Sequence, residues 1–219
     1  MKPPRAERLV LAGPAGDLEA LIEAPGRDPH GVSGESAPTA FGVVCHPHPL
    51  YGGTLDNKVV YTLARAFGEC GAPVIRFNFR GVGRSAGHYD EGRGETDDTL
   101  AAIAHGRQRW PAAALWLAGF SFGAAVAVRA AASQSPARLV AVAPGVTRIA
   151  MEEVPSPRCP WLLVQGDADE VIEPAAVLEW ARRQAVPPLI RTFPGAGHFF
   201  HGRLHELRQT VVQFMTTGG

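Results

Sequence analysis

One stretch of this sequence limits the possible fold more than any other: a serine between two glycines, joining two apolar runs. Leu115–Ala118 are apolar, Gly119–Gly123 read Gly-Phe-Ser-Phe-Gly, and positions 124–132 hold small apolar residues apart from one arginine. The pattern predicts a buried strand, a very tight turn and a buried helix. Glycines two residues either side of Ser121 leave room for a strained turn that exposes the hydroxyl. The helix then directs free N–H groups and a partial positive charge toward the serine oxygen.

Apolar runs and helical periodicity alternate along the rest of the chain. A hairpin is expected over 8–12 and 17–23, and a loop rich in glycine, proline and serine over 25–38. Strands are predicted at 41–45, 72–78, 115–118, 138–143, 161–165 and 189–193, and most of the internal ones are continuous apolar runs of the buried-strand type. Helical patterns lie at 57–69, 94–109, 174–184 and in a final stripe of Leu204, Leu207, Val211 and Phe214. This alternation predicts a mostly parallel sheet with helices on both faces.

Composition excludes several classes of protein. The 219 residues are 46% hydrophobic and 19% charged, which fits a single globular domain over residues 1–219 with a substantial core. Basic and acidic residues number 21 each and no basic stripe is interleaved with aromatics, so nucleic acid is not an expected partner. No apolar run approaches the ~18 residues of a membrane span. The three scattered cysteines do not indicate a disulfide framework, so we predict a soluble cytoplasmic protein with reduced thiols. The sequence does not indicate an oligomeric state.

The loops that carry polar chemistry all follow predicted strands. They come after Cys45, after Asn78, at Ser121, after Gln165 and after Phe193. Open parallel sheets bind their ligands beyond the carboxyl ends of the strands, where these loops meet. The five-residue glycine–serine pattern also occurs in ordinary turns, and this agreement favours a reactive serine over a plain turn.

A serine hydroxyl is a weak nucleophile that needs a base, and the base needs an orienting acid. His198 follows the last predicted strand after small residues, which makes it the expected base, whereas His201 and His205 suit solvated or helix-capping roles. The acid stays open among three carboxylates in the loop after Gln165. They are Asp167, Asp169 and Glu170.

An oxyanion formed at such a serine needs N–H donors. One donor is expected from Phe122 at the start of the helix, and the second from the loop that begins at His46. Prolines at positions 47 and 49 have no N–H, so His48 is the first free donor in that loop. His46 is expected to brace the loop by hydrogen bonds. The alternatives for the second donor are the N–H groups of Leu50 and Tyr51 and the Tyr51 hydroxyl.

At this point the chain resembles the α/β-hydrolase superfamily, and most closely its small bacterial members near the dienelactone-hydrolase and serine-esterase branches. The resemblance covers nearly all of the chain from residue 41 on. The matching stretches are His46–Thr54 with Asp56-Asn57-Lys58, Arg76–Ser85, Gly119–Gly123, Gly166–Asp169 and Gly195–Phe200. The chain order serine, acid, histidine is also that of α/β hydrolases. Two departures are the His-Pro-His-Pro loop in place of the usual His-Gly, and a serine where dienelactone hydrolases typically have cysteine.

The resemblance implies an α/β-hydrolase fold with an eight-stranded sheet and a Ser121–His198–Asp169 triad, because the family acid usually sits three residues after the turn glycine. It also implies a carboxylesterase-like activity on small esters, without a cofactor or a metal. Cap domains of this superfamily are usually inserted after the sixth strand. Here that connection, positions 144–160, is as short as an ordinary loop with one helical turn, so we expect no lid. Substrate contacts are expected from Leu50, Phe120 and Phe199.

Three alternatives to an esterase are weighed against this interpretation. The same triad would serve a thioesterase or a peptidase-like acyl hydrolase. A metal-dependent hydrolase would use the histidines with Asp169, but the chain has no His-Glu-x-x-His and two prolines stiffen the His46–His48 pair. A non-catalytic binding member of the fold would be expected to lack part of the triad. The histidines available for the metal alternative are His46, His48, His198, His201 and His205.

Overall fold

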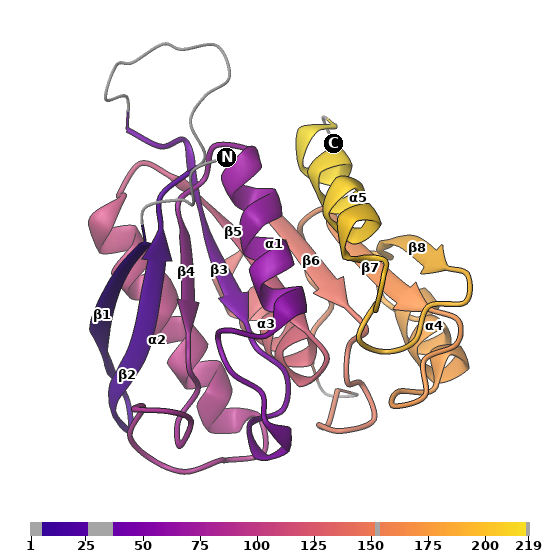
Figure 1. Ribbon diagram of the computed structural model, residues 1–219, viewed down its shortest axis with the longest axis horizontal. Coiled ribbons are helices and arrows are strands. Elements are labelled where there is room, and N and C mark those ends of the chain that lie inside the picture. Colours follow the sequence, from indigo (N-terminus) through magenta and orange to yellow (C-terminus); the bar gives the residue numbers. More distant parts are fainter. Residues whose placement is uncertain (1–5, 26–36, 152–153, 218–219) are drawn as a thin grey trace.

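The computed structural model, which describes residues 6–25, 37–151 and 154–217, has one eight-stranded sheet with helices on both faces (Figure 1). The strand order is β1-β2-β4-β3-β5-β6-β7-β8. The strands are β1 Ala6–Gly13, β2 Gly16–Glu23, β3 Ala40–Cys45, β4 Val74–Phe77, β5 Ala114–Phe120, β6 Arg138–Val142, β7 Trp161–Gly166 and β8 Leu189–Phe193. The helices are α1 Lys58–Glu69, α2 Arg93–Arg109, α3 Phe122–Gln134, α4 Pro174–Arg182 and α5 Leu204–Thr216, with a short 3-10 turn, η1, at Pro49–Tyr51.

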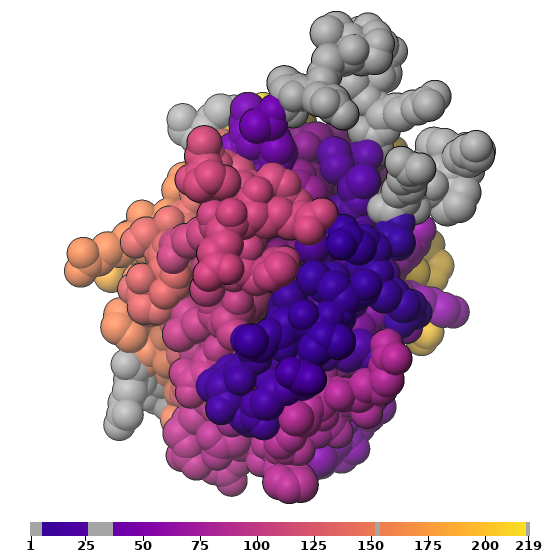
Figure 2. Space-filling view, turned by 90° about the vertical axis from the view of Figure 1, so that its left-hand side faces the viewer, coloured from indigo at the N-terminus to yellow at the C-terminus, as the bar shows by residue number. Residues whose placement is uncertain are grey.

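Strands β3 to β8 run parallel, and β2 joins them antiparallel to β4. The hairpin β1–β2 forms one edge of the sheet and lies against α2, as the indigo residues of Figure 2 show. The internal strands β3 and β7 are buried along their whole length, which explains why their sequences are almost entirely apolar. The prediction of an α/β-hydrolase fold with a mostly parallel eight-stranded sheet is therefore confirmed.

Two apolar layers hold the helices on the sheet. Alternate strand residues face opposite sides, so Val43 belongs to the apolar cluster that includes buried residues of α2, α3 and α4, whereas Val44 belongs to the cluster that includes buried residues of α1 and α5. The buried residues of α3 itself are mostly alanine and valine, and such small side chains let the helix pack closely on β5. This close packing fixes the position at which β5 passes into α3, which is where Ser121 lies.

Several predicted boundaries shift at their ends. Strand β4 is shorter than the predicted 72–78, and α4 ends at Arg182 rather than at 184. In the connection from β6 to β7, residues 144–151 and 154–160 form turns and irregular segments without a helix or strand, so no cap domain is formed by these residues, as predicted. Most of the loop predicted over 25–38 lies outside the described residues. Within the described ranges, no helix has the length and apolar character needed to cross a bilayer.

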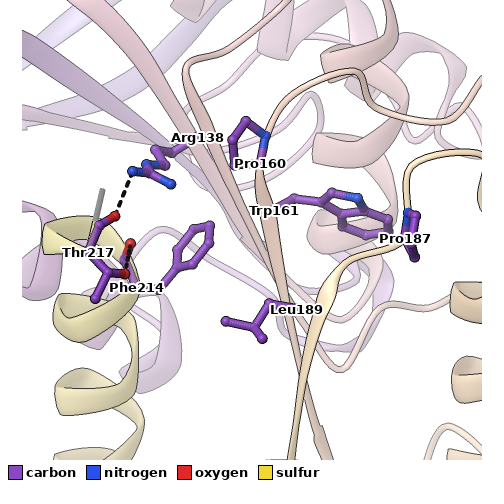
Figure 3. Close-up of a pocket in the computed structure, with 7 residues that line it drawn as sticks. All are labelled: Arg138, Pro160, Trp161, Pro187, Leu189, Phe214 and Thr217. Carbon is purple, nitrogen blue, oxygen red and sulfur yellow. Dashed lines mark hydrogen bonds between the residues drawn. The ribbon is translucent and has the colours of Figure 1, made fainter. Parts of the chain in front are cut away.

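A shallow groove of about 310 Å³ opens at the amino ends of β6, β7 and β8, where Arg138 donates a hydrogen bond to the Thr217 carbonyl (Figure 3). Ser121 follows the carboxyl end of β5, so it lies at the other end of the parallel strands. The groove is therefore remote from the chemistry predicted from the sequence. Its lining residues are Arg138, Pro160, Trp161, Pro187, Leu189, Phe214 and Thr217.

A buried ion pair ties the edge hairpin to the loop before α1. Arg76 on β4 donates from Nη2 to Glu23 Oε1 on β2 at 2.6 Å, and from Nη1 to the carbonyl oxygen of Leu55. Both charged side chains are almost fully buried. Removing one partner of such a pair leaves an uncompensated buried charge, so the cost exceeds that of breaking a surface pair.

We therefore expect Arg76→Met to lower the free energy of unfolding by about 3–5 kcal/mol, measured by urea denaturation at neutral pH. Arg183→Met provides the matched control, because the pair Arg183–Glu179 is exposed on both sides and contributes about 0–1 kcal/mol. The double variant Glu23→Leu with Arg76→Met should recover part of the loss, since no unpaired charge is then buried. Equal effects of the two single substitutions would contradict the structural role given to Arg76.

Candidate active site

Ser121 occupies a strained turn between β5 and α3. Its φ angle is 57° and its ψ angle is −122°, a conformation that residues other than glycine rarely adopt. The turn is held by the Ser121 N–H, which donates to the Val142 carbonyl at 2.9 Å, and by the Ser121 carbonyl, which accepts from Gly145 N–H at 3.0 Å. The serine hydroxyl therefore lies beyond the end of the sheet, at the N-terminus of α3.

The two flanking glycines are required by close backbone contacts. A Cβ atom at Gly119 would lie 2.2 Å from the carbonyl oxygen of Gly123. A Cβ atom at Gly123 would lie 2.2 Å from the carbonyl oxygen of His46. Because both obstacles are backbone atoms, no side-chain rotation relieves them. The glycine pattern that predicted the turn thus also positions the loop after β3.

A chain of hydrogen bonds links Ser121 to a histidine and a carboxylate. His198 Nε2 lies 2.9 Å from Ser121 Oγ, and His198 Nδ1 lies 2.8 Å from Asp169 Oδ2. All three residues are buried. With the carboxylate ionised, Nδ1 carries the proton and donates it to Asp169, which leaves Nε2 to accept the hydrogen bond from the serine hydroxyl.

The structure distinguishes the three acids that the sequence left open. Asp167 Oδ1 accepts a hydrogen bond from Gly195 N–H at 2.6 Å, and Glu170 Oε2 accepts one from the His198 backbone N–H at 3.1 Å. Both carboxylates thus hold the loop that carries His198. Of the three, only Asp169 contacts the imidazole ring.

Four hydrogen bonds orient the Asp169 carboxylate. Oδ1 accepts from the N–H groups of Val171 and Ile172 at 2.9 and 2.8 Å, and Oδ2 accepts from Gln165 Nε2 at 2.9 Å in addition to His198. Burial by itself raises the pKa of Asp169, but the hydrogen bonds from His198, Ile172 and Val171 outweigh it, so the pKa lies below its usual value. The site therefore favours an ionised Asp169.

Sequence reasoning missed Gln165 as part of this site. Its side chain is fully buried and donates from Nε2 both to Asp169 and to the Gly166 carbonyl, the latter at 3.1 Å. An amide nitrogen rather than an oxygen must face the carboxylate, so the orientation of the amide is determined by its neighbours. A polar residue at the end of the apolar run 161–164 was the available signal.

The candidate oxyanion donors differ in whether their N–H groups are already hydrogen-bonded. The Phe122 N–H is the first of α3 and has no intrahelical acceptor. Among the alternatives after β3, Leu50 N–H donates to His48 Nδ1 at 3.2 Å and Tyr51 N–H donates to the His48 carbonyl at 3.1 Å, so both are engaged within the loop. The His48 N–H makes no hydrogen bond to any described residue.

His46 braces this loop, as the sequence analysis expected. Its Nε2 accepts from the Phe79 N–H at 2.9 Å, so Nδ1 carries the proton and donates to the Pro47 carbonyl at 2.6 Å. Burial lowers the pKa of His46 to about 4, although the bond to Pro47 opposes the shift. Burial and the nearby positive charge of Arg148 also lower the pKa of His48. Both rings are therefore neutral at pH 7.

The three predicted substrate residues differ in accessibility. Leu50 on η1 is 67% exposed and Phe199 is 42% exposed. Tyr51, the alternative oxyanion donor that follows Leu50, is 79% exposed. Phe120, by contrast, is fully buried and packs against the His198 ring at a centroid distance of 4.9 Å. Phe120 therefore packs against the His198 ring and does not face a substrate. The prediction that Phe120 contacts the substrate is wrong.

The metal alternative finds little support in the side chains. His46, the first residue it would use, has both ring nitrogens in hydrogen bonds. In the part of the chain that the structure describes, no three His, Cys, Asp or Glu side chains are grouped as metal ligands. Cys45, which lies behind the loop, is buried, and this burial raises the pKa of its thiol to about 12.

Comparison with known proteins identifies close relatives. Residues 52–154, which include Ser121, match a family model described as serine aminopeptidase, S33. A structure from Xanthomonas campestris, described as an α/β serine hydrolase without lid, is 40% identical, with a TM-score of 0.89 over 98% of this chain and 95% of that chain. An α/β serine hydrolase homologue from Coxiella burnetii is 43% identical, with a TM-score of 0.87 over 94% of this chain and 96% of the other. This chain belongs to the family of lidless α/β serine hydrolases.

More distant structures share the fold of this chain but do not identify its substrate. An esterase from Pyrococcus furiosus is 18% identical, with a TM-score of 0.77 over 97% of this chain and 90% of that chain. At this identity the likeness concerns the fold alone. The family model ends before Asp169 and His198. The assignment of these two residues to the site of this lidless hydrolase therefore rests on their hydrogen bonds.

The lowered pKa of Asp169 makes a prediction about stability at acid pH. The unfolded carboxyl titrates near ~3.9 and the folded one below that, so its contribution to stability is fully present above the unfolded pKa. That contribution is lost as the pH falls through the folded pKa. We expect the difference in unfolding free energy between the parent protein and Asp169→Asn to shrink between about pH 5 and pH 2.

Urea denaturation of both proteins across this range provides the measurement. The other acids titrate in both proteins, so their effects cancel in the difference. A difference that stays constant, or grows on acidification, would contradict the ionised and hydrogen-bonded state assigned to Asp169.

Proposed function

We propose that this serine hydrolase cleaves small carboxylic esters through an acyl-enzyme formed on Ser121. The observation that supports the proposal most strongly is the unbroken line of hydrogen bonds from Ser121 Oγ through His198 to Asp169. Nucleophile, base and orienting acid stand in the relation that acyl transfer requires.

In the first step, Ser121 Oγ attacks the ester carbonyl carbon while His198 Nε2 takes the hydroxyl proton. The carbonyl π electrons move to the oxygen, which becomes an oxyanion bound by the N–H groups of Phe122 and His48. Asp169 holds the tautomer of His198 and stabilises the imidazolium that forms. The strained backbone at Ser121 is already in the geometry that the attack needs, so no reorganisation precedes it.

The intermediate then collapses and the bond to the alcohol oxygen breaks. His198 gives its proton to that oxygen, and the alcohol leaves an acyl group on Ser121. In the second half of the reaction, His198 removes a proton from water while the water oxygen attacks the acyl carbon. The second intermediate then collapses, the bond from the acyl carbon to Ser121 Oγ breaks, and Oγ regains its proton from His198. The products are a carboxylic acid and an alcohol, and the proposed chemistry needs no cofactor or metal.

The preference for small esters rests on the openness of the site. The carboxyl edge of the sheet has no cap in the described chain, and Leu50 and Tyr51 border the site as exposed apolar side chains. The distant Pyrococcus furiosus neighbour is described as an esterase, which agrees with this substrate class. We also propose the cytoplasm as the location, supported by three unpaired cysteines, and neither nucleic acid nor membrane as a partner.

A peptidase-like hydrolase is the second candidate, because the matching family model is described as a serine aminopeptidase. A thioesterase would use the same serine and histidine. Amides have a poorer leaving group than esters, so a peptidase must protonate the amine nitrogen before it departs. Relative rates on matched esters, thioesters and amides separate the three.

A panel of p-nitrophenyl esters of increasing acyl length tests the proposal, with acyl thioesters and aminoacyl p-nitroanilides beside it. We expect kcat/KM to be highest for short acyl esters and to fall by at least ~10³-fold in Ser121→Ala, since the triad then lacks its nucleophile. Ser133→Ala, at the other end of α3, is the matched control and should retain the parent rate. Near-normal hydrolysis by Ser121→Ala would refute the mechanism, and higher rates on the anilides would favour a peptidase.

A further inference from the structure

Two consecutive phenylalanines after His198 turn in opposite directions. Phe200 is fully buried and packs edge-on against Phe193, with a centroid distance of 5.5 Å. Phe199 is 42% exposed at the site. Of the ten phenylalanines, all of which the structure describes, Phe199 alone is not buried.

The backbone is strained to maintain this arrangement. Phe200 has a φ angle of 51°, in the left-handed region that bulky residues rarely adopt. The turn is held by Phe200 N–H, which donates to the Gly197 carbonyl at 3.1 Å, and by the Phe200 carbonyl, which accepts from Arg203 N–H at 2.9 Å. Strain that persists at a site points to a use for the residue it exposes.

The Phe199 ring packs against the imidazole of His198. Its centroid lies 5.1 Å from that of His198, with the two planes nearly perpendicular, and 6.1 Å from that of Phe120. The His48 ring packs on Phe122, at 4.9 Å, beside the candidate oxyanion donors. Phe199 is thus next to the proton donor for the departing alcohol, whereas His48 is next to the donors for the carbonyl oxygen.

This arrangement distinguishes the two halves of an ester. The carbonyl oxygen must reach the N–H groups of Phe122 and His48, and the alcohol oxygen must come within hydrogen-bond distance of His198 Nε2. The group attached to the alcohol oxygen therefore passes on the His198 side. We propose, on the basis of the esterase function proposed above, that Phe199 forms the leaving-group subsite and selects esters of apolar alcohols.

Benzyl and methyl butyrate test this assignment, because they share the acyl group and their alcohols are of similar acidity. In the parent protein we expect kcat/KM to favour the benzyl ester. In Phe199→Ala this preference should fall about tenfold, while kcat/KM for the methyl ester stays within about threefold of the parent value. Phe199→Leu keeps an apolar side chain and should retain most of the preference.

Tyr61→Ala is the matched control. Tyr61 on α1 is 43% exposed, almost as much as Phe199, and its ring lies under Arg76 rather than at the site. The benzyl preference should be unchanged in this variant. A preference that fell equally in Tyr61→Ala and Phe199→Ala would contradict a local subsite.

Deacylation provides a second readout that a merely structural role of Phe199 would disturb. Both butyrate esters give the same acyl-enzyme, so a contact with the alcohol acts only before the alcohol leaves. After a burst with p-nitrophenyl butyrate, Phe199→Ala should deacylate at the parent rate. A uniform loss over both esters and deacylation would show displacement of His198 and overturn the subsite, as would an unchanged benzyl preference. If the parent protein cleaved no ester, the proposed function itself would fail.

Discussion

At Ser121 the backbone takes a φ angle of 57°, and the geometry of the site depends on that reversal. The hydroxyl leaves the sheet where α3 offers its first unpaired N–H groups. The same turn brings the backbone of Gly123 so close to the His46 carbonyl that a Cβ atom would not fit. The turn that exposes the nucleophile thereby also positions the loop with the second N–H donor. The packing of β5 against an alanine-rich helix supports both.

Around this turn, burial determines which polar groups carry charge. The pKa of His46 is lowered to about 4 and that of the Cys45 thiol is raised to about 12, so both groups are neutral at pH 7. Asp169 is held ionised by hydrogen bonds from two backbone N–H groups, His198 and Gln165. The negative charge therefore sits behind the imidazole, where it stabilises the cation that proton transfer creates. The thiol behind the loop is no competing nucleophile.

The sequence could predict those parts of the site that depend on local backbone geometry. The glycines around Ser121 specify their turn by steric exclusion, and the last strand, Leu189–Phe193, begins and ends where its apolar pattern does. The acid could not be chosen from spacing, because three carboxylates share one loop and their roles depend on which N–H groups the fold brings to each. The burial of Phe120 beneath His198 depends in the same way on tertiary packing that no local pattern encodes.

Covalent capture identifies the nucleophile of the folded protein. The protein is treated with a fluorophosphonate, and the adduct is counted by intact mass and located by peptide mapping. We expect one adduct per chain, on Ser121, because the hydroxyl reacts only beside its base. No adduct should form on protein that is denatured beforehand, and the reaction should be strongly slowed in His198→Ala. An adduct on another residue, or no adduct on a protein that still cleaves esters, would contradict the role given to Ser121.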